Sequence, residues 1–282
     1  MTITEDNFRI RPMTKDDLKI ALSWAASEGW NPGIDDVDNF YIADPGGFLI
    51  GELNGQPISC ISVVRYSPKF NFIGLYIVQP EERKKGFGLK IWQEALNLIP
   101  NQTAALDAVL QQVNNYQKFG FQPTHSHLRY QGIITGTISP DIRNLKTIDF
   151  EQLCRYDERY FPGSRPHFLS TWINQPHGQG YAIFDEDDLV GYGVIRKAMD
   201  GFKIAPLFAE NTEIAEKLFL ALATYAEESP IYIDVPNINQ SAILLFENYQ
   251  MNSVFECVRM YKGESPNIDW QNVFAVTSLE LG

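Results

Sequence analysis

The spacing of apolar side chains in the first half of the chain changes from helical to alternating and back again. Residues 15–26 repeat apolar positions every three or four residues, which predicts a helix. Thr14 and Asp17 have the spacing of a capping box at its start. A second helix is predicted over residues 35–42, ending before the turn-forming sequence at 44–47. Both helices precede a region with strand character.

Three apolar runs, residues 48–53, 58–66 and 72–78, are separated by turn signals and predict an antiparallel meander. Asn54-Gly55 is a typical hairpin turn between the first two. Further along the chain, the pattern predicts a helix over 88–99 that Pro100 ends, a strand at 104–110 and a short helix at 114–119.

The second half repeats this order of elements after a polar segment rich in small residues at 132–140, which we take as a domain boundary. Residues 106–109 resemble 233–235, and residues 128–130 resemble 258–261, which favours an internal duplication. We therefore predict an α/β (α+β) protein with domains 1–136 and 137–282. Each domain would hold a mixed, mostly antiparallel sheet flanked by helices.

Composition narrows the classes of function. The 282 residues are 44% hydrophobic and carry a formal charge of −12, which disfavours nucleic acid as the main partner. No apolar run reaches the roughly 18 residues of a membrane span, and the polar N-terminus does not resemble a secretory signal. The three cysteines show neither metal-ligand nor disulfide spacing, so we expect no metal and a reducing cytoplasm.

Residues 75–90 form the most informative segment, a strand that passes through a basic loop with glycines into a helix. The first amides of a helix have no intrahelical partner and favour anions. Gly86 and Gly88 would let a phosphate approach the backbone, and four cations lie close by: Arg83, Lys84, Lys85 and Lys90. The alternative is a solvated turn before an amphipathic helix. The Walker spacing is absent.

Two motifs in order resemble the GCN5-related N-acetyltransferase (GNAT) superfamily. Arg83-Lys-Lys-Gly86-Phe-Gly88 is similar to its acetyl-CoA loop, and Tyr116-Gln-Lys-Phe-Gly120-Phe121 to its later signature. The wider sequence resembles a bacterial subgroup, related to YitH-type acetyltransferases, that carries two such domains in tandem. The resemblance implies a sheet whose central strands splay apart, with acetyl-CoA bound in the gap.

The resemblance also implies residue roles. Tyr116 would be the general acid that protonates the leaving thiolate. Cofactor-binding positions carried over are Ile77, Val78, Arg83, Lys84, Lys85, Gly86, Phe87, Gly88, Leu89 and Asn115.

Candidates for the general base and for the acceptor site stay open. Asp107, Glu28, His125 and His127 could each accept a proton, although Asp107 could equally be a satisfied structural carboxylate. The two histidines alternate along a strand, so one is expected to face solvent. Aromatic candidates for the acceptor pocket are Trp24, Trp30 and Tyr76, with core packing as the alternative.

The second half departs from both motifs. Its counterpart of the basic loop, residues 204–216, has no glycine or basic residue and carries Glu210, Glu213 and Glu216. Phe246 stands at the tyrosine position. We therefore predict an acetyl-CoA-dependent N-acetyltransferase with its chemistry in the first half, acting on a small-molecule or peptide amine. The alternative is a non-catalytic acyl-CoA-binding or regulatory module, and the sequence does not indicate the oligomeric state.

Overall fold

The computed structural model of the chain describes residues 7–67 and 69–282. The elements of the first half, in chain order, are β1 (Phe8–Pro12), α1 (Lys15–Ser27), α2 (Asp36–Ala43), β2 (Phe48–Leu53), β3 (Gln56–Ser67), β4 (Phe70–Val78), α3 (Phe87–Asn97), β5 (Ala104–Val109), α4 (Val113–Gln117) and β6 (Gln122–Gly132). These bounds agree with the predicted elements to within about two residues at most ends.

The second half repeats this order, with an additional strand at its end. Its elements are β7 (Arg143–Asn144), α5 (Phe150–Asp157), α6 (Pro166–Asn174), β8 (Gly178–Asp185), β9 (Asp188–Lys197), β10 (Phe202–Ala209), α7 (Thr212–Ala223), β11 (Ile231–Pro236), α8 (Gln240–Asn248), β12 (Asn252–Lys262) and β13 (Val273–Ala275). The mixed, mostly antiparallel sheet flanked by helices confirms the predicted fold class.

Local signals explain several of these boundaries. Thr14 accepts from the Asp17 amide while the Asp17 carboxylate accepts from the Thr14 amide, so α1 begins with the predicted capping box. Asn54 and Gly55 both have positive φ, +53° and +76°, as the tight turn between β2 and β3 requires.

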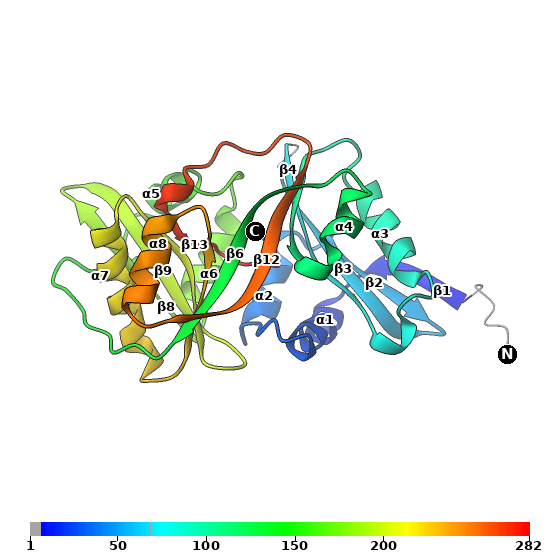
Figure 1. Cartoon of the computed structure of the whole chain (residues 1–282), viewed down its shortest axis with the longest axis horizontal. Coiled ribbons are helices and arrows are strands. Elements are labelled where there is room, and N and C mark those ends of the chain that lie inside the picture. The colour runs from blue at the N-terminus through cyan, green and yellow to red at the C-terminus, as the bar shows by residue number, and fades with distance from the viewer. Residues whose placement is uncertain (1–6, 68) are drawn as a thin grey trace.

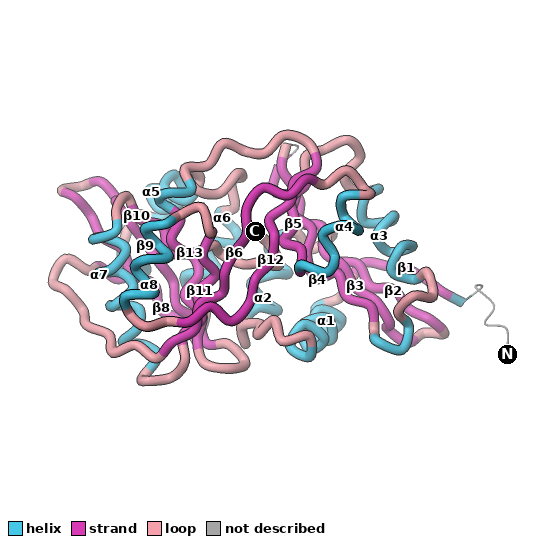
Figure 2. Tube along the Cα trace, viewed as in Figure 1, coloured by secondary structure: helices cyan, strands magenta, loops and turns pink. Residues whose placement is uncertain are grey.

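All strands of the described residues join in one 13-stranded sheet, ordered β1-β2-β3-β4-β5-β12-β6-β11-β10-β9-β8-β7, with β13 beside β10 (Figures 1 and 2). This order reads the same from both ends when each strand is replaced by its counterpart in the other half. The duplication therefore appears as a two-fold repeat centred between β12 and β6.

The two halves exchange their long terminal strands. β12, from the second half, lies antiparallel to β5 of the first half, and β6 lies antiparallel to β11. Figure 1 shows β6 and β12 crossing the middle of the molecule side by side, where they also pair with each other. The predicted domain boundary near residue 136 therefore does not divide the sheet, which continues from one half of the chain into the other.

The hydrophobic cores follow the same arrangement. One core joins α1 and α2 of the first half to α5 and α6 of the second, for example through Phe40 against Trp172. A second core lies under α3 and a third under α7 and α8. The two halves therefore share buried surface as well as strands. None of the described helices has the length and apolar character needed to cross a membrane.

Candidate active site

The site lies where β4 and β5 separate. These parallel strands pair only from Asn71 to Ile73, opposite Ala104 to Leu106. The pairing of β3 with β4 shifts register at this point, and Leu75 has a φ of +46°, which indicates a bulge that turns β4 away from β5. A cavity of about 620 Å³ opens in the resulting gap.

The N-terminus of α3 closes one end of this cavity. Gly86 is the N-cap with a φ of +90° and no side-chain cap, so the first amides of α3 have no partner within the helix. A Cβ on Gly88 would lie 2.8 Å from the Tyr76 hydroxyl, so glycine allows this close packing. The backbone here forms a concave donor surface suited to a diphosphate.

The cations of the loop are held in different ways. Arg83 donates through Nε to the Val78 carbonyl at 2.8 Å, and its Nη2 forms an ion pair with Glu28. Lys84 lines the cavity, whereas Lys85 pairs with Glu82 at 3.2 Å. Arg83 therefore links the anion-binding loop to the end of α1.

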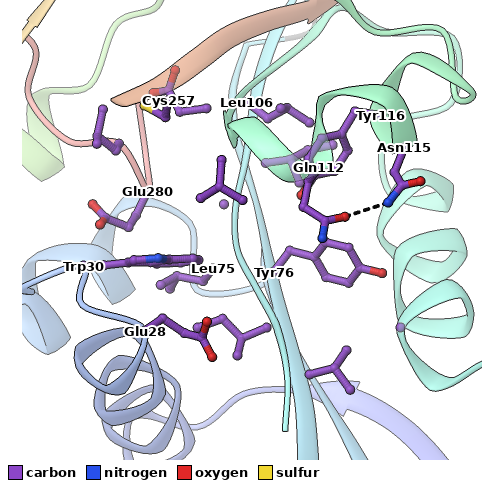
Figure 3. A pocket seen from close by; sticks show the side chains of 18 of the residues that line it. Glu28, Trp30, Leu75, Tyr76, Leu106, Gln112, Asn115, Tyr116, Cys257 and Glu280 are labelled. Atoms are coloured by element: carbon purple, nitrogen blue, oxygen red, sulfur yellow. Dashed lines mark hydrogen bonds between the residues drawn. The ribbon is translucent and has the colours of Figure 1, made fainter. Parts of the chain in front are cut away.

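Most residues predicted to bind cofactor line the cavity: Ile77, Val78, Arg83, Lys84, Gly86, Gly88, Leu89 and Asn115. The side chains of Lys85 and Phe87 do not. Phe87 is buried and packs against Phe8 at 4.8 Å, so its contribution is restricted to the backbone amide. Asn115 donates to Gln112 at 2.7 Å beside the cavity (Figure 3).

Tyr116 lies on the wall of the cavity, at the start of the signature that ends in Phe121. Its ring packs against Trp92 at 5.2 Å, and burial raises the pKa of its phenol. Tyr76 lies on the same side of the cavity (Figure 3), and burial raises its pKa to about 12. Both phenols therefore remain protonated at neutral pH and can donate.

Asp107 is committed to a buried ion pair. Both of its oxygens accept from Arg259, at 2.7 and 2.8 Å, and one contacts His127 at 3.2 Å. Burial alone would raise the pKa of Asp107, but the positive charge of Arg259 and the contact with His127 lower it. This environment makes Asp107 a weak proton acceptor.

The expectation that one of the two histidines would face solvent is wrong. Residues two apart on a strand point to the same face, so His125 and His127 share one face of β6. Trp270 covers that face, with its ring 4.4 Å from that of His125, and both histidines are buried. Burial lowers the pKa of His125 to about 2. Neither histidine lines the cavity.

One group of side chains has the proximity of a metal site. Potential ligand atoms of Asp107, His127 and Cys257 lie within 4.8 Å of one another. The Asp107 oxygens already accept from Arg259, however, and burial raises the pKa of the Cys257 thiol well above its usual value. Neither residue is therefore a free anionic ligand.

On the opposite side of the cavity lie Trp30, Glu28 and Glu280 (Figure 3). The Trp30 carbonyl accepts from Arg129 at 2.8 Å and from Lys203 at 3.1 Å, so two buried cations hold this loop in place. Trp24 does not reach the cavity. It lies one turn before Glu28 on α1 and packs against the core that the two halves share, as its helical spacing from Leu18 and Ala21 requires.

Comparison with known proteins agrees with this geometry. A model described as "Acetyltransferase (GNAT) family" matches residues 15–121, and another described as "Acetyltransferase (GNAT) domain" matches residues 153–275. The "Holothin acyltransferase" of Pseudoalteromonas sp. (strain SANK 73390) is 30% identical over 275 residues, covering 96% of this chain and 94% of that protein. The chain is a tandem GNAT acetyltransferase.

Other relatives of this GNAT protein extend the comparison. The "Uncharacterized N-acetyltransferase YitH" of Bacillus subtilis (strain 168) is 25% identical and covers 78% of this chain and 79% of its own length. A putative acetyltransferase from Pyrococcus horikoshii shares the fold with a TM-score of 0.84 at 21% identity, over 98% of this chain and 96% of that one. GNAT proteins use acetyl-CoA as cosubstrate, which agrees with an anion-binding loop beside splayed strands.

The second half of this GNAT protein has the same splay, but the gap is filled. β10 pairs with β11 only from Phe202 to Ile204, the positions equivalent to Asn71 to Ile73. Beyond that point β13 pairs with β10, and the Val276 amide donates to the Asp234 carbonyl at 3.0 Å. The Asn211 side chain also caps α7 by accepting from the Ile214 amide at 3.0 Å.

Sequence reasoning missed part of the cavity wall. Gln112 and Leu75 come from the first half, whereas Phe255, Cys257, Leu279 and Glu280 come from β12 and from the segment after β13. No local motif marks these second-half residues, because the strand exchange and the path of the C-terminal segment bring them here. The similarity of residues 106–109 to 233–235 and of 128–130 to 258–261 was an available signal of the exchange, since Asp107 pairs with Arg259 and Asp234 with Arg129.

Proposed function

We propose that this protein transfers the acetyl group of acetyl-CoA to the amino group of a small molecule, by direct attack of the amine on the thioester. The observation that carries the proposal is the open gap between β4 and β5, bounded by the uncapped start of α3 and by Tyr116. The equivalent gap between β10 and β11 is occupied by β13, so we assign one acetyl-CoA site to each chain.

Acetyl-CoA supplies an activated thioester. On the protein side, the amides at the start of α3 would hold the diphosphate together with Lys84. The exposed backbone of Ile77 and Val78 would bind the pantetheine arm and orient the carbonyl. Tyr116, whose pKa is raised, would donate a proton to the departing sulfur. The paired state of Asp107 favours a positioning role, in which it fixes Arg259 and the β5–β12 contact.

We propose a small acceptor because side chains bound the cavity opposite Tyr116. These are Trp30, Glu28 and the segment around Glu280. The Pseudoalteromonas relative is named for the acceptor holothin, so we include holothin among the first amines to test.

The experiment is a screen of primary amines with acetyl-CoA that measures release of free CoA thiol. We expect release that depends on an added amine and saturates with it. Gly86→Glu should abolish release, because a carboxylate at the start of α3 repels the diphosphate and a side chain at a φ of +90° is strained. Saturable binding of acetyl-CoA without amine-dependent release across the screen would instead support the non-catalytic acyl-CoA-binding alternative.

A further inference from the structure

Glu280 is an exception among the buried carboxylates of the described residues. Five acidic residues are less than 9% exposed, and four of them form ion pairs with arginine: Asp17 with Arg11, Asp36 with Arg196, Asp157 with Arg165 and Asp234 with Arg129. Glu280 is 6% exposed, yet no lysine, arginine or histidine in residues 7–67 and 69–282 lies within ion-pair distance of it. A buried carboxylate without a cation is unfavourable unless another group neutralises it.

Two buried cations, Lys203 and Arg129, interact with Glu280 through their charge, but their hydrogen bonds go to other groups. Lys203 donates to the Trp30 carbonyl at 3.1 Å, and Arg129 divides its donors between that carbonyl and Asp234. The Glu280 side chain has one hydrogen bond within the described residues, from the Ser278 hydroxyl to Oε2 at 2.6 Å. The carboxylate can therefore accept further hydrogen bonds from a ligand in the cavity.

The segment that carries Glu280 is fixed in place. The Tyr66 hydroxyl donates to the Leu281 carbonyl at 2.9 Å, and Arg165 donates to Thr277 at 2.8 Å. A Cβ on Gly74 would lie 1.9 Å from the Glu280 carbonyl oxygen, so the segment packs directly on the backbone of β4 where the splay begins. Glu280 is held beside the position where the thioester is expected, across the cavity from Tyr116 (Figure 3).

We propose that Glu280 binds the amino group of the acceptor, so that the second half of the chain supplies the acceptor-binding carboxylate for chemistry in the first half. This inference rests on the proposed function. An ammonium group would provide a counter-ion in direct contact with the carboxylate, which Arg129 and Lys203 do not. A neutral amine would donate an N–H to the same oxygen. Trp30 lies beside this position and offers a flat apolar surface to the group that carries the amine.

If the amine is neutral, Glu280 also completes the proton balance. The nitrogen forms the new bond to the carbonyl carbon and becomes positively charged, and its proton passes to the Glu280 carboxylate. The carbon–sulfur bond then breaks and the sulfur takes a proton from Tyr116. The products are the N-substituted acetamide and CoA thiol. Glu280 then releases its proton to solvent and the Tyr116 phenolate takes one back, so both residues return to their starting states.

The first test compares stability, which does not require a known acceptor. Glu280→Gln retains the bond to Ser278 and removes only the charge. We expect an unchanged or raised Tm, because an unpaired buried charge is lost. Asp234→Asn, which breaks a paired carboxylate from Arg129, should lower Tm. A fall in Tm for Glu280→Gln similar to that of Asp234→Asn would overturn the proposal, since Glu280 would then be a structural counter-ion.

The second test measures kinetics with the amine that wild-type protein acetylates fastest. Glu280→Gln should lower kcat/KM for this amine by about tenfold or more, with KM for acetyl-CoA unchanged. Glu264→Gln, at an exposed glutamate of the same half, is the matched control and should leave both constants unchanged. Wild-type kcat/KM in Glu280→Gln would refute the role of Glu280, whereas an inactive wild-type protein would refute the proposed function and leave the Tm comparison to decide on Glu280.

Repeating the assay with benzylamine and aniline distinguishes the two forms of acceptor. Benzylamine is cationic at neutral pH and aniline is uncharged. A loss restricted to benzylamine would assign Glu280 as an ammonium-binding residue, and a loss with both would assign it also as proton acceptor.

Discussion

At the scale of single residues, the surroundings of Tyr116 fit its proposed role as general acid. Its ring is held by Trp92 and Phe121, and burial raises the pKa of its phenol, so the proton is retained well above neutral pH. Tyr116→Phe keeps the packing and removes the proton. We expect kcat to fall by about 10²-fold, with the Kd for acetyl-CoA unchanged in calorimetry. Equal turnover of wild type and variant between about pH 6 and pH 9 would exclude Tyr116 as the acid.

His125 illustrates the cost of a buried titratable group. Burial lowers its pKa to about 2, while in the unfolded chain the value returns to about 6.5. Below that pH the unfolded state binds a proton that the folded state does not, so acid favours unfolding. The free energy of unfolding should decrease by about 1.4 kcal/mol for each pH unit below 6.5 from this residue alone. Urea titrations at several pH values should show that the free energy of unfolding depends less steeply on pH in His125→Gln than in wild type. His167→Gln, at an exposed histidine, should keep the wild-type slope.

At the scale of elements, the two gaps in the sheet are bordered by different segments of the chain. The gap between β4 and β5 is open and leads to α3, which begins at Gly86 without a side-chain cap. In the gap between β10 and β11, β13 pairs with β10, and the following helix, α7, is capped by Asn211. Calorimetry should therefore give one acetyl-CoA for each chain, and Gly86→Glu should remove it. A second site that survives Gly86→Glu would show that the β13 side of the sheet also binds the cosubstrate.

The sequence predicts those elements whose signals are local. The capping box at Thr14, the Asn54-Gly55 turn and the glycines at 86 and 88 each fix backbone conformation within a few residues, so they can be predicted without a structure. The order of β12 and β6 in the sheet depends on pairing between residues far apart, such as Arg259 and Asp107. A strand predicted from alternation carries no information about its neighbour. Glu280 was missed for the same reason, since contacts between residues far apart in the sequence, such as Gly74 with the Glu280 backbone and Tyr66 with Leu281, place it in the cavity.

At the scale of the whole molecule, strand exchange makes the two halves depend on each other. Without β12, the edge of β5 would be exposed and Asp107 would lose Arg259. Without β6, the edge of β11 would be exposed and Asp234 would lose Arg129. Breaking one buried pair of this kind costs about 3–5 kcal/mol, a large part of the usual stability of a domain.

We therefore expect neither residues 1–136 nor residues 137–282 to fold alone, although each contains a complete set of GNAT elements in sequence. Urea unfolding of the whole chain should show one transition, coincident by tryptophan fluorescence and far-UV circular dichroism. Co-expression of the two fragments should restore a soluble complex that binds acetyl-CoA, because β6 and β12 can then pair across the chains. Arg259→Ala and Arg129→Ala should each lower the urea concentration at the midpoint of this single transition. Two separate transitions, or a folded and monomeric first fragment, would show that the exchanged strands contribute little to the stability of either half.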